Sequence, residues 1–327
     1  MSVKLSVVIA THGQSKNLGG TLLSLQKQSF PSEEYEIIVV ENGPKSNARN
    51  IVEDINRKYS NHVKYVYDSR PGLHHGRNTG AKVVEGDIVL YTDDDVIAGS
   101  NWIKEIYRCY DRPDVAVVGG KIVGRWEVEP PEWMWLFGTK ENIWVLSTLD
   151  LGEGIFELQG KNVFGANYSA RKSVIIEVGG SNPDLFPCYL KHLGGDGEAG
   201  FLDKVRARGY KIIYNSNAVV EHCIPASRCT SEYFIAQFEK VAIESAYHIY
   251  RNSNGSIIAL IKSLLLQTLS LVKYYGKTLL FQPNRLVMYK IKLAYYISFF
   301  NHSFRLIFSR SLKQHTLKKN YMNEDIT

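Results

Sequence analysis

The chain has 327 residues, 44% hydrophobic and 22% charged, which excludes a disordered, collagen-like or low-complexity protein. That length suits one large α/β domain with an appendage, or two modest domains, and four cysteines without a CxxC pair exclude a disulfide scaffold and a clustered zinc site. Of the 39 basic and 33 acidic residues, 12 basic and no acidic ones lie in residues 251–319. Because Glu324 and Asp325 follow, residues 1–250 hold 27 basic and 31 acidic residues, which excludes a general nucleic-acid-binding surface.

The first half of the chain alternates short apolar runs with amphipathic stretches. A buried parallel strand is predicted at residues 5–10, and further strands at residues 36–41, 63–67 and 88–92. Helices are predicted between them, at residues 17–28, 48–59 and 76–84. This alternation predicts βαβ units in an α/β fold, with a mostly parallel sheet flanked by helices.

After about residue 115 the alternation loosens. Strands are predicted at residues 116–119, 163–170, 210–214 and 218–221, and a helix at 199–208. An aromatic loop is predicted at 126–135, and its rings and those of residues 164–168 are expected either to stack on sugars in an acceptor pocket or to pack in the core. Nearly everything beyond residue 233 is helical in period, and a domain boundary is placed near residue 250. Residues 251–327 are expected to form a basic, apolar helical appendage.

Neither a signal peptide nor a clean transmembrane helix is expected. The opening apolar run at residues 5–10 is too short for a signal peptide. The most apolar region, residues 257–281, is cut by Lys262, Lys273 and Lys277, so no run reaches the roughly 20 residues of a span. Residues 251–319 are instead expected to dock on an anionic membrane surface, or to pack on the core or on a partner subunit. The cationic anchors expected for docking are Lys262, Lys273, Lys277, Arg285, Lys290 and Lys292.

Asp93, Asp94 and Asp95 directly follow the predicted strand 88–92. Three successive carboxylates repel one another unless a cation lies among them or solvent screens them. At the carboxyl end of a parallel strand they face the crevice where α/β folds bind ligands, and their oxygens suit Mg²⁺ or Mn²⁺. The sequence thus predicts a divalent-metal site, with a solvated acidic turn as the alternative.

Other polar residues stand at predicted strand ends and helix starts. Glu41 ends the second strand, where it can accept hydrogen bonds from a nucleoside or merely precede an Asn-Gly turn. Arg77 lies where a glycine-rich turn enters a helix, which suits phosphate contact. Asp196 and Glu198 open a helix, where capping is the ordinary role. His222 follows the last strand and is a weak signal by itself.

Taken together, these motifs resemble the inverting glycosyltransferases of family 2, which have the Rossmann-like, nucleotide-sugar-binding GT-A fold. The resemblance covers residues 4–228. Its most specific parts are the first strand and helix, Pro71-Gly72 with Arg77-Asn78-Thr79-Gly80, the triple aspartate as a DXD-type motif, and the late His222. Glu41 departs from the family, which normally has Asp at that position.

The resemblance implies a metal-dependent transferase that moves a sugar from a nucleotide-sugar, such as a UDP-sugar, to a glycan or lipid-linked acceptor. Residues 1–120 would form the nucleotide-binding half and residues 121–250 the acceptor half. The residues implied for nucleotide-sugar binding are Thr11, Glu41, Arg77, Asp93 and Asp94, and those for Mg²⁺ or Mn²⁺ are Asp95 and His222. A cytoplasmic enzyme of surface-glycan biosynthesis, peripheral on the inner membrane face, is the implied setting.

The resemblance also implies a carboxylate base eleven positions before the glycine that ends its helix. Counting back from Gly209 gives Glu198, whereas a two-residue insertion would give Asp196. We assign Glu198 as the base, with Asp196 capping the helix or orienting the acceptor. Two other classes remain open: a sugar-1-phosphate nucleotidyltransferase, and a non-catalytic nucleotide-binding scaffold.

Overall fold

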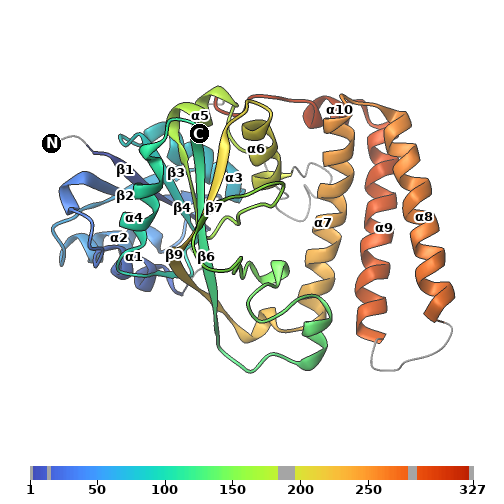
Figure 1. Cartoon of the computed structure of the whole chain (residues 1–327), viewed down its shortest axis with the longest axis horizontal. Helices are drawn as coiled ribbons and strands as arrows, with labels where there is room; N and C mark the ends of the chain where they lie inside the picture. Colours follow the sequence, from blue (N-terminus) through green and yellow to red (C-terminus); the bar gives the residue numbers. More distant parts are fainter. Residues whose placement is uncertain (1–2, 13–15, 183–195, 279–285, 324–327) are drawn as a thin grey trace.

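The computed structural model describes residues 3–12, 16–182, 196–278 and 286–323. Figure 1 shows a β-sheet flanked by helices, with long helices standing beside it as a separate layer. The α/β class and the C-terminal helical appendage predicted from the sequence are both present.

In the described part of the chain, nine strands form one sheet with the order β3-β2-β1-β4-β8-β6-β9-β5, and β7 pairs with β9. The strands are β1 (Leu5–Thr11), β2 (Tyr35–Asn42), β3 (Val63–Asp68), β4 (Ile88–Thr92), β5 (Val96–Ala98), β6 (Val115–Trp126), β7 (Ile155–Glu157), β8 (Tyr168–Arg171) and β9 (Lys211–Ile224). The first four run parallel, as predicted. Beyond β4 the sheet is mixed, because β8 runs antiparallel to both β4 and β6.

Helices cover the sheet and extend beyond it. They are α1 (Leu18–Leu25), α2 (Ala48–Asn56), α3 (Leu73–Val83), α4 (Trp102–Tyr107), α5 (Lys172–Glu177), α6 (Gly197–Arg206), α7 (Ser231–Asn252), α8 (Ile257–Thr278), α9 (Leu286–Phe308) and α10 (Arg310–Thr316). Strands β1, β2 and β4 are buried along their whole length, which explains why they read as continuous apolar runs.

Two predicted strand boundaries were wrong. The strand predicted at 163–170 is limited to Tyr168–Arg171, and residues 163–167 are irregular. In that irregular stretch, Asn167 uses its side chain to hold its neighbours: its Nδ2 donates to the carbonyls of Lys121 (2.9 Å) and Ala218 (2.8 Å). The two strands predicted at 210–214 and 218–221 are one strand, β9, which absorbs a register shift opposite Gly120 and Lys121.

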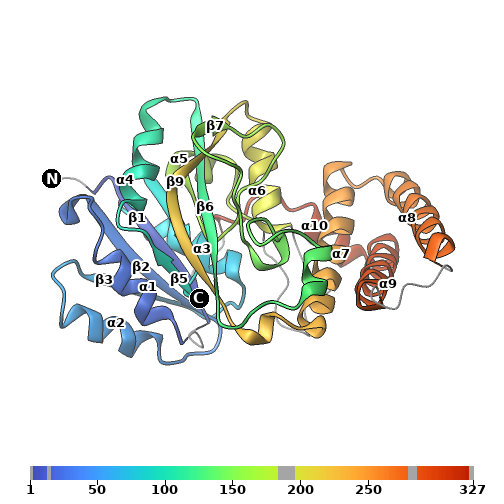
Figure 2. The ribbon, with the colours of Figure 1, turned by 60° about the horizontal axis from the view of Figure 1, so that its bottom comes forward.

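The appendage consists of α7 to α10, and Figure 2 shows α8 and α9 on the side of α7 away from the sheet. The α7–α9 interface buries apolar and aromatic side chains: Ala242, Ala246, Tyr250, Phe299 and Leu306. The boundary proposed near residue 250 falls in the last turn of α7, whose first turns contact the sheet domain through Phe234.

Candidate active site

The strand register brings polar residues to one edge of the sheet. Ile9 of β1 pairs with Thr92 of β4, so the residues that follow these two strands emerge side by side. Thr11 donates a hydrogen bond to the Asp94 carboxylate across that edge. The same edge carries Asp93 and Asp95, so the triple aspartate lies at the carboxyl ends of parallel strands, as predicted.

Buried Asp95 and His222 form a cluster with the half-buried Arg228. The pairing of β5 with β9 aligns Val96 with His222, which brings His222 Nε2 to 3.2 Å from Asp95 Oδ1. Arg228, on the turn after β9, donates from Nη2 to Asp95 Oδ2 at 2.8 Å. Burial alone would raise the pKa of Asp95, but His222 and Arg228 outweigh it and hold that pKa below its usual value. Asp95 is therefore ionised at neutral pH.

A divalent metal fits the chemistry of this cluster. Asp93, Asp95 and His222 each offer a ligand atom, and these atoms lie within 4.8 Å of one another. His222 Nδ1 lies 2.9 Å from the Leu146 carbonyl oxygen, which can only accept, so Nδ1 carries the hydrogen and Nε2 faces the carboxylate. Two carboxylates and one imidazole whose ring is oriented by the Leu146 carbonyl form a donor set that can hold Mn²⁺ or Mg²⁺.

Arg77 connects the triple aspartate to Glu198. Its guanidinium is 1% exposed and donates to Asp93 Oδ1 at 2.8 Å and to Glu198 Oε1 at 2.6 Å. His74 Nε2 lies 3.1 Å from the second Glu198 oxygen. Although burial opposes ionisation, His74 and Arg77 hold the pKa of Glu198 well below its usual range. Glu198 is thus kept as a carboxylate, with a side chain that is still 27% exposed.

Gly165 makes room for this ion pair. A Cβ at that position would overlap both the Glu198 carboxylate and the Arg77 guanidinium. Residues 163–167 leave regular strand geometry at this point, where their backbone must pass beneath the pair. Gly165→Ala is expected to displace Arg77 or Glu198 and to reduce turnover much more than stability, as comparison of kcat with the urea midpoint would show. Gly19→Ala is the control, because Gly19 has no positive φ and its Cβ position meets only one atom, of Ile51, at the ordinary contact distance of 3.9 Å.

Glu41 has partners within its own part of the sheet. Its carboxylate accepts hydrogen bonds from the Ser46 backbone N–H (2.7 Å) and from the hydroxyls of Ser46 and Tyr65. The side chain is buried, and it does not line the pocket that contains the triple aspartate. A contact between Glu41 and a nucleoside remains a prediction.

Asp196 points away from the ion pair and into the appendage. It occupies the N-cap position of α6, but its side chain makes no capping hydrogen bond, so the predicted capping role is wrong. It accepts instead from Arg251 Nη2 at 2.6 Å and pairs with His248 Nδ1 at 3.1 Å, both on α7, and it also accepts from Asn182. The contacts of Asp196 therefore hold the start of α6, where Glu198 lies, against α7. Gly194 and Gly195, which precede Asp196 and could form the turn that accommodates a two-residue insertion, lie outside the described residues.

Asp196→Asn is expected to destabilise the fold by about 3 kcal/mol, because it leaves the mostly buried Arg251 guanidinium beside a neutral partner. Urea unfolding measures the loss of free energy, and catalysis per folded molecule is expected to stay close to that of the wild type. A fully stable variant without turnover would instead identify Asp196 as the base.

His248 makes part of this stability depend on pH. The hydrogen bond with Asp196, helped by the charges of Asp196 and Asp203 and opposed by burial and Arg251, raises the pKa of His248 above 6.5. The stabilisation that protonated His248 gives the folded state is therefore complete below pH 6.5, and it is lost as the pH rises through the higher pKa of the folded state. Because the side chain is 37% exposed, we expect the loss to be below about 1 kcal/mol. The melting temperature should fall less across this pH window in His248→Gln than in the wild type; equal falls would contradict the assignment.

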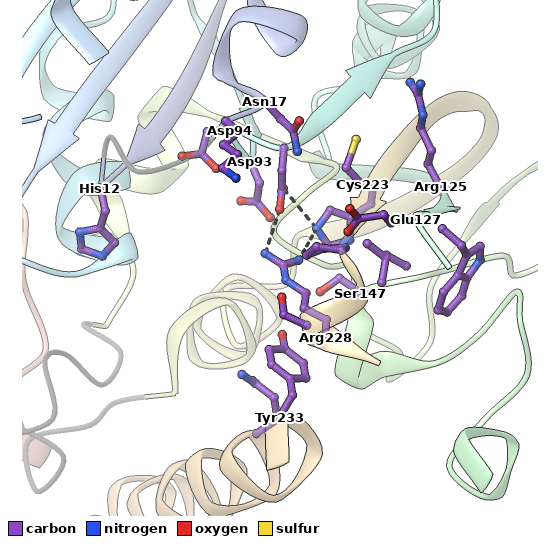
Figure 3. Close-up of a pocket in the computed structure, with 18 of the residues that line it drawn as sticks. His12, Asn17, Asp93, Asp94, Arg125, Glu127, Ser147, Cys223, Arg228 and Tyr233 are labelled. Atoms are coloured by element: carbon purple, nitrogen blue, oxygen red, sulfur yellow. Dashed lines mark hydrogen bonds and ion pairs between the residues drawn. The ribbon is translucent and has the colours of Figure 1, made fainter. Parts of the chain in front are cut away.

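The triple aspartate lines one end of a pocket of about 1040 Å³ that extends toward α7 (Figure 3). In that view Arg228 lies between Asp93 and Tyr233, with Arg125 further out on one side. The walls beyond the aspartates come from the ends of β6 and β9 and from α7: Arg125, Trp126, Glu127, Arg228, Tyr233, Gln237 and Lys240. Trp126 thus places part of the predicted aromatic loop at the pocket, whereas Tyr168 is buried beneath Arg77.

Sequence reasoning did not assign roles to His74 or Arg228. His74 was visible only as one of two adjacent histidines in a glycine-rich turn, and Arg228 as an arginine beyond a strand. Neither pattern says which side chain it will meet, because their partners Glu198 and Asp95 are 124 and 133 positions away. These contacts join residues that are far apart in the sequence, so only the folded structure shows them.

A family profile described as Glycosyl transferase family 2 matches residues 6–167. A glucosyl-dolichyl phosphate glucuronosyltransferase of Haloferax volcanii is 27% identical over 223 residues, which cover 67% of this chain and 69% of that protein. The poly(ribitol-phosphate) β-N-acetylglucosaminyltransferase TarS of Staphylococcus aureus is 31% identical over 103 residues, which cover 32% of this chain and only 18% of TarS.

Solved structures show the same fold. The mannosyltransferase PcManGT of Pyrobaculum calidifontis, in complex with GDP-Man and Mn²⁺, superimposes with a TM-score of 0.59 at 15% identity and covers 95% of this chain and 88% of its own. GalNAc-T7 with UDP, GalNAc and Mn²⁺ gives a TM-score of 0.52 at 15% identity, covering 76% of this chain and 50% of its own. The fold predicted from the sequence, GT-A, is confirmed.

Proposed function

Because the chain belongs to glycosyl transferase family 2, we propose that it moves a sugar from a nucleotide-sugar to an acceptor hydroxyl with inversion at the anomeric carbon. One observation carries this proposal above the others. Arg77 joins the aspartate cluster, which can hold a metal and a diphosphate, to Glu198, which can receive a proton. The two halves of a single displacement, departure of the diphosphate and attack by a hydroxyl, thereby share one site.

The donor would bind along the strand ends, with Thr11, Asp93 and Asp94 toward its nucleoside and sugar and Glu41 nearer the base. Asp95 and His222, with Asp93, would hold Mn²⁺ or Mg²⁺, which when bound supplies positive charge beside the leaving diphosphate. Arg228 lies in the same pocket and can place its guanidinium against the diphosphate. We favour a UDP-sugar as the donor.

Glu198 would accept the proton of the attacking hydroxyl. Arg77 and His74 fix the position of its two oxygens and keep it ionised at neutral pH, so it is ready to receive a proton in each cycle. The same contacts lower its proton affinity in the resting state, so substrate binding must loosen one of them as the hydroxyl approaches. Asp196 would hold the start of α6 in place.

The acceptor would enter from the wall formed by Trp126, Tyr233 and Lys240. The rings of Trp126 and Tyr233 can stack on a sugar, and the Lys240 ammonium can bind a phosphate. The glucuronosyltransferase named above acts on a glucosyl-dolichyl phosphate, which supports a lipid-linked or oligosaccharide acceptor in surface-glycan synthesis. A cytoplasmic site on the inner membrane face follows as the expected location.

Product analysis across a panel of nucleotide-sugars, with Mn²⁺ and with a chelator, tests the proposal. We expect one donor to release nucleoside diphosphate and free sugar slowly in Mn²⁺ and to release neither with the chelator. Release of pyrophosphate in a reaction with sugar-1-phosphate and nucleoside triphosphate would identify a nucleotidyltransferase instead. Tight binding of a nucleotide-sugar without any turnover would identify a scaffold.

A further inference from the structure

The outer side of α8 is an exposed apolar surface. Six residues at helical spacing form a stripe, which we call the α8 stripe: Ile258, Ile261, Leu265, Leu266, Leu269 and Val272. Each of them is between 44% and 69% exposed. The opposite side of the helix faces the appendage, where Leu260 is buried and Leu264 packs against its core. This helix is therefore apolar on both sides, and one of them has no covering layer in the described chain.

A second exposed stripe runs along α9. Its other side packs on α7, and its exposed apolar residues are Leu286, Leu293, Ile297, Phe304 and Phe308, of which Phe308 is 81% exposed. Figures 1 and 2 place α8 and α9 next to each other at the end of the molecule farthest from the sheet. Scattered exposed apolar side chains are normal on a soluble protein, but two apolar stripes of this length on neighbouring helices indicate an interaction surface.

The charges around the α8 stripe indicate what that surface meets. Lys262 and Lys273 are exposed one turn away from Ile258 and Leu269, within the stripe itself, and Lys290 is exposed on α9. Residues 251–319 contain no carboxylate that could neutralise them. If a second copy covered the stripe across a two-fold axis, it would bring lysines toward lysines in an apolar contact. An anionic membrane offers both partners at once, because its headgroups carry the charge opposite to the lysines and its acyl chains can cover the apolar side chains.

We propose that α8 lies along an anionic membrane surface with the α8 stripe at the boundary between headgroups and acyl chains. Its 22 residues extend over about 33 Å parallel to that surface. Lys262 and Lys273 can run their stems over apolar side chains and place their ammonium groups among lipid phosphates. This surface is independent of the catalytic residues, so the proposal does not rest on the proposed function.

A surface helix explains the structure better than a membrane span. Residues 257–275 are long and apolar enough to cross a bilayer by length and hydropathy. A span would, however, carry Lys262 and Lys273 into the bilayer on the lipid-facing side of the helix. It would also remove α8 from α9, where the Lys292 ammonium lies 4.0 Å from the Tyr274 ring. Lys277 and Arg285, predicted as further anchors, lie outside the described side chains.

Flotation of the full chain with lipid vesicles tests the proposal. We expect it to float with phosphatidylcholine vesicles that contain phosphatidylglycerol, and not with phosphatidylcholine alone. Leu265→Gln with Leu269→Gln should abolish flotation, because both side chains are exposed and belong to the stripe. The matched control is Thr268→Gln with Ser270→Gln, exposed positions beside the stripe on the same helix, which should float like the wild type.

Charge and topology give two further readouts. Lys262→Ala with Lys273→Ala should weaken binding to the anionic vesicles by roughly 30-fold, from about 1 kcal/mol for each lysine. Alkaline carbonate should release the bound chain, and retention in the membrane would overturn the surface orientation in favour of a span. No flotation, or flotation unchanged by the two Leu→Gln substitutions, would overturn the proposal. A dimer in solution that the same substitutions dissociate would assign the stripe to a second copy.

Discussion

Glu198→Gln is expected to lower kcat by roughly 10²–10⁴, the usual effect of losing a general base. Donor affinity should stay nearly unchanged, since the base meets the acceptor and not the nucleotide. Gln keeps the size of the side chain and one oxygen for Arg77, so the pocket should remain folded. Comparison of kcat with the dissociation constant for the donor separates these two effects.

Comparison with Asp196→Asn shows which of the two carboxylates is the base. That carboxylate is held by Arg251 and His248 of α7, so its loss should appear in stability and not in kcat. If Glu198→Gln turns over normally while Asp196→Asn is inactive, the base is Asp196 and the assignment of Glu198 is wrong. The two variants differ from the wild type by one charge each, which makes them matched.

Asp95→Asn is expected to abolish Mn²⁺ binding and metal-stimulated donor binding, with a loss of transfer that follows from both. The variant removes one of the three residues that can ligate the ion and leaves His222 and Arg228 beside a neutral amide. Electron paramagnetic resonance of Mn²⁺ gives a readout that does not depend on activity. Circular dichroism and the urea midpoint establish that the variant is folded.

Asp94→Asn provides the neighbouring control for metal binding. Asp94 is adjacent in sequence but accepts a hydrogen bond from Thr11 and does not belong to the group of three potential ligands. We expect it to keep Mn²⁺ binding close to that of the wild type and to weaken the donor. Metal affinity that fell equally in both variants would contradict a site centred on Asp95 and His222.

The sequence was a good guide wherever local pattern determines structure. Four short runs separated by helical periods were sufficient to predict the parallel strands β1 to β4. The signal is strongest for β1, β2 and β4, because strands buried on both faces need apolar side chains throughout, whereas β3 lies at the sheet edge and is only partly buried. The position of the triple aspartate followed from its place after β4. The strand predicted at 163–170 failed because Gly165 and Asn167 serve contacts with distant residues that no local pattern records.

The choice between Asp196 and Glu198 shows the same limit within the site. Both are acidic residues at one helix start, two positions apart, and spacing from Gly209 could accommodate either. The structure separates them because the helix turns one toward α3 and the other toward α7. Arg77 and Arg251 are the partners that distinguish them, and each lies more than fifty positions from its carboxylate.

The anomeric configuration of the first sugar released is the most direct test of a single displacement at this site. With an α-linked nucleotide-sugar, Mn²⁺ and no acceptor, water would take the place of the attacking hydroxyl beside Glu198. Proton nuclear magnetic resonance, recorded before the free sugar mutarotates, should then show the β-anomer first, and the signal should fall with Glu198→Gln. Initial release of the α-anomer would contradict inversion and the role given to Glu198.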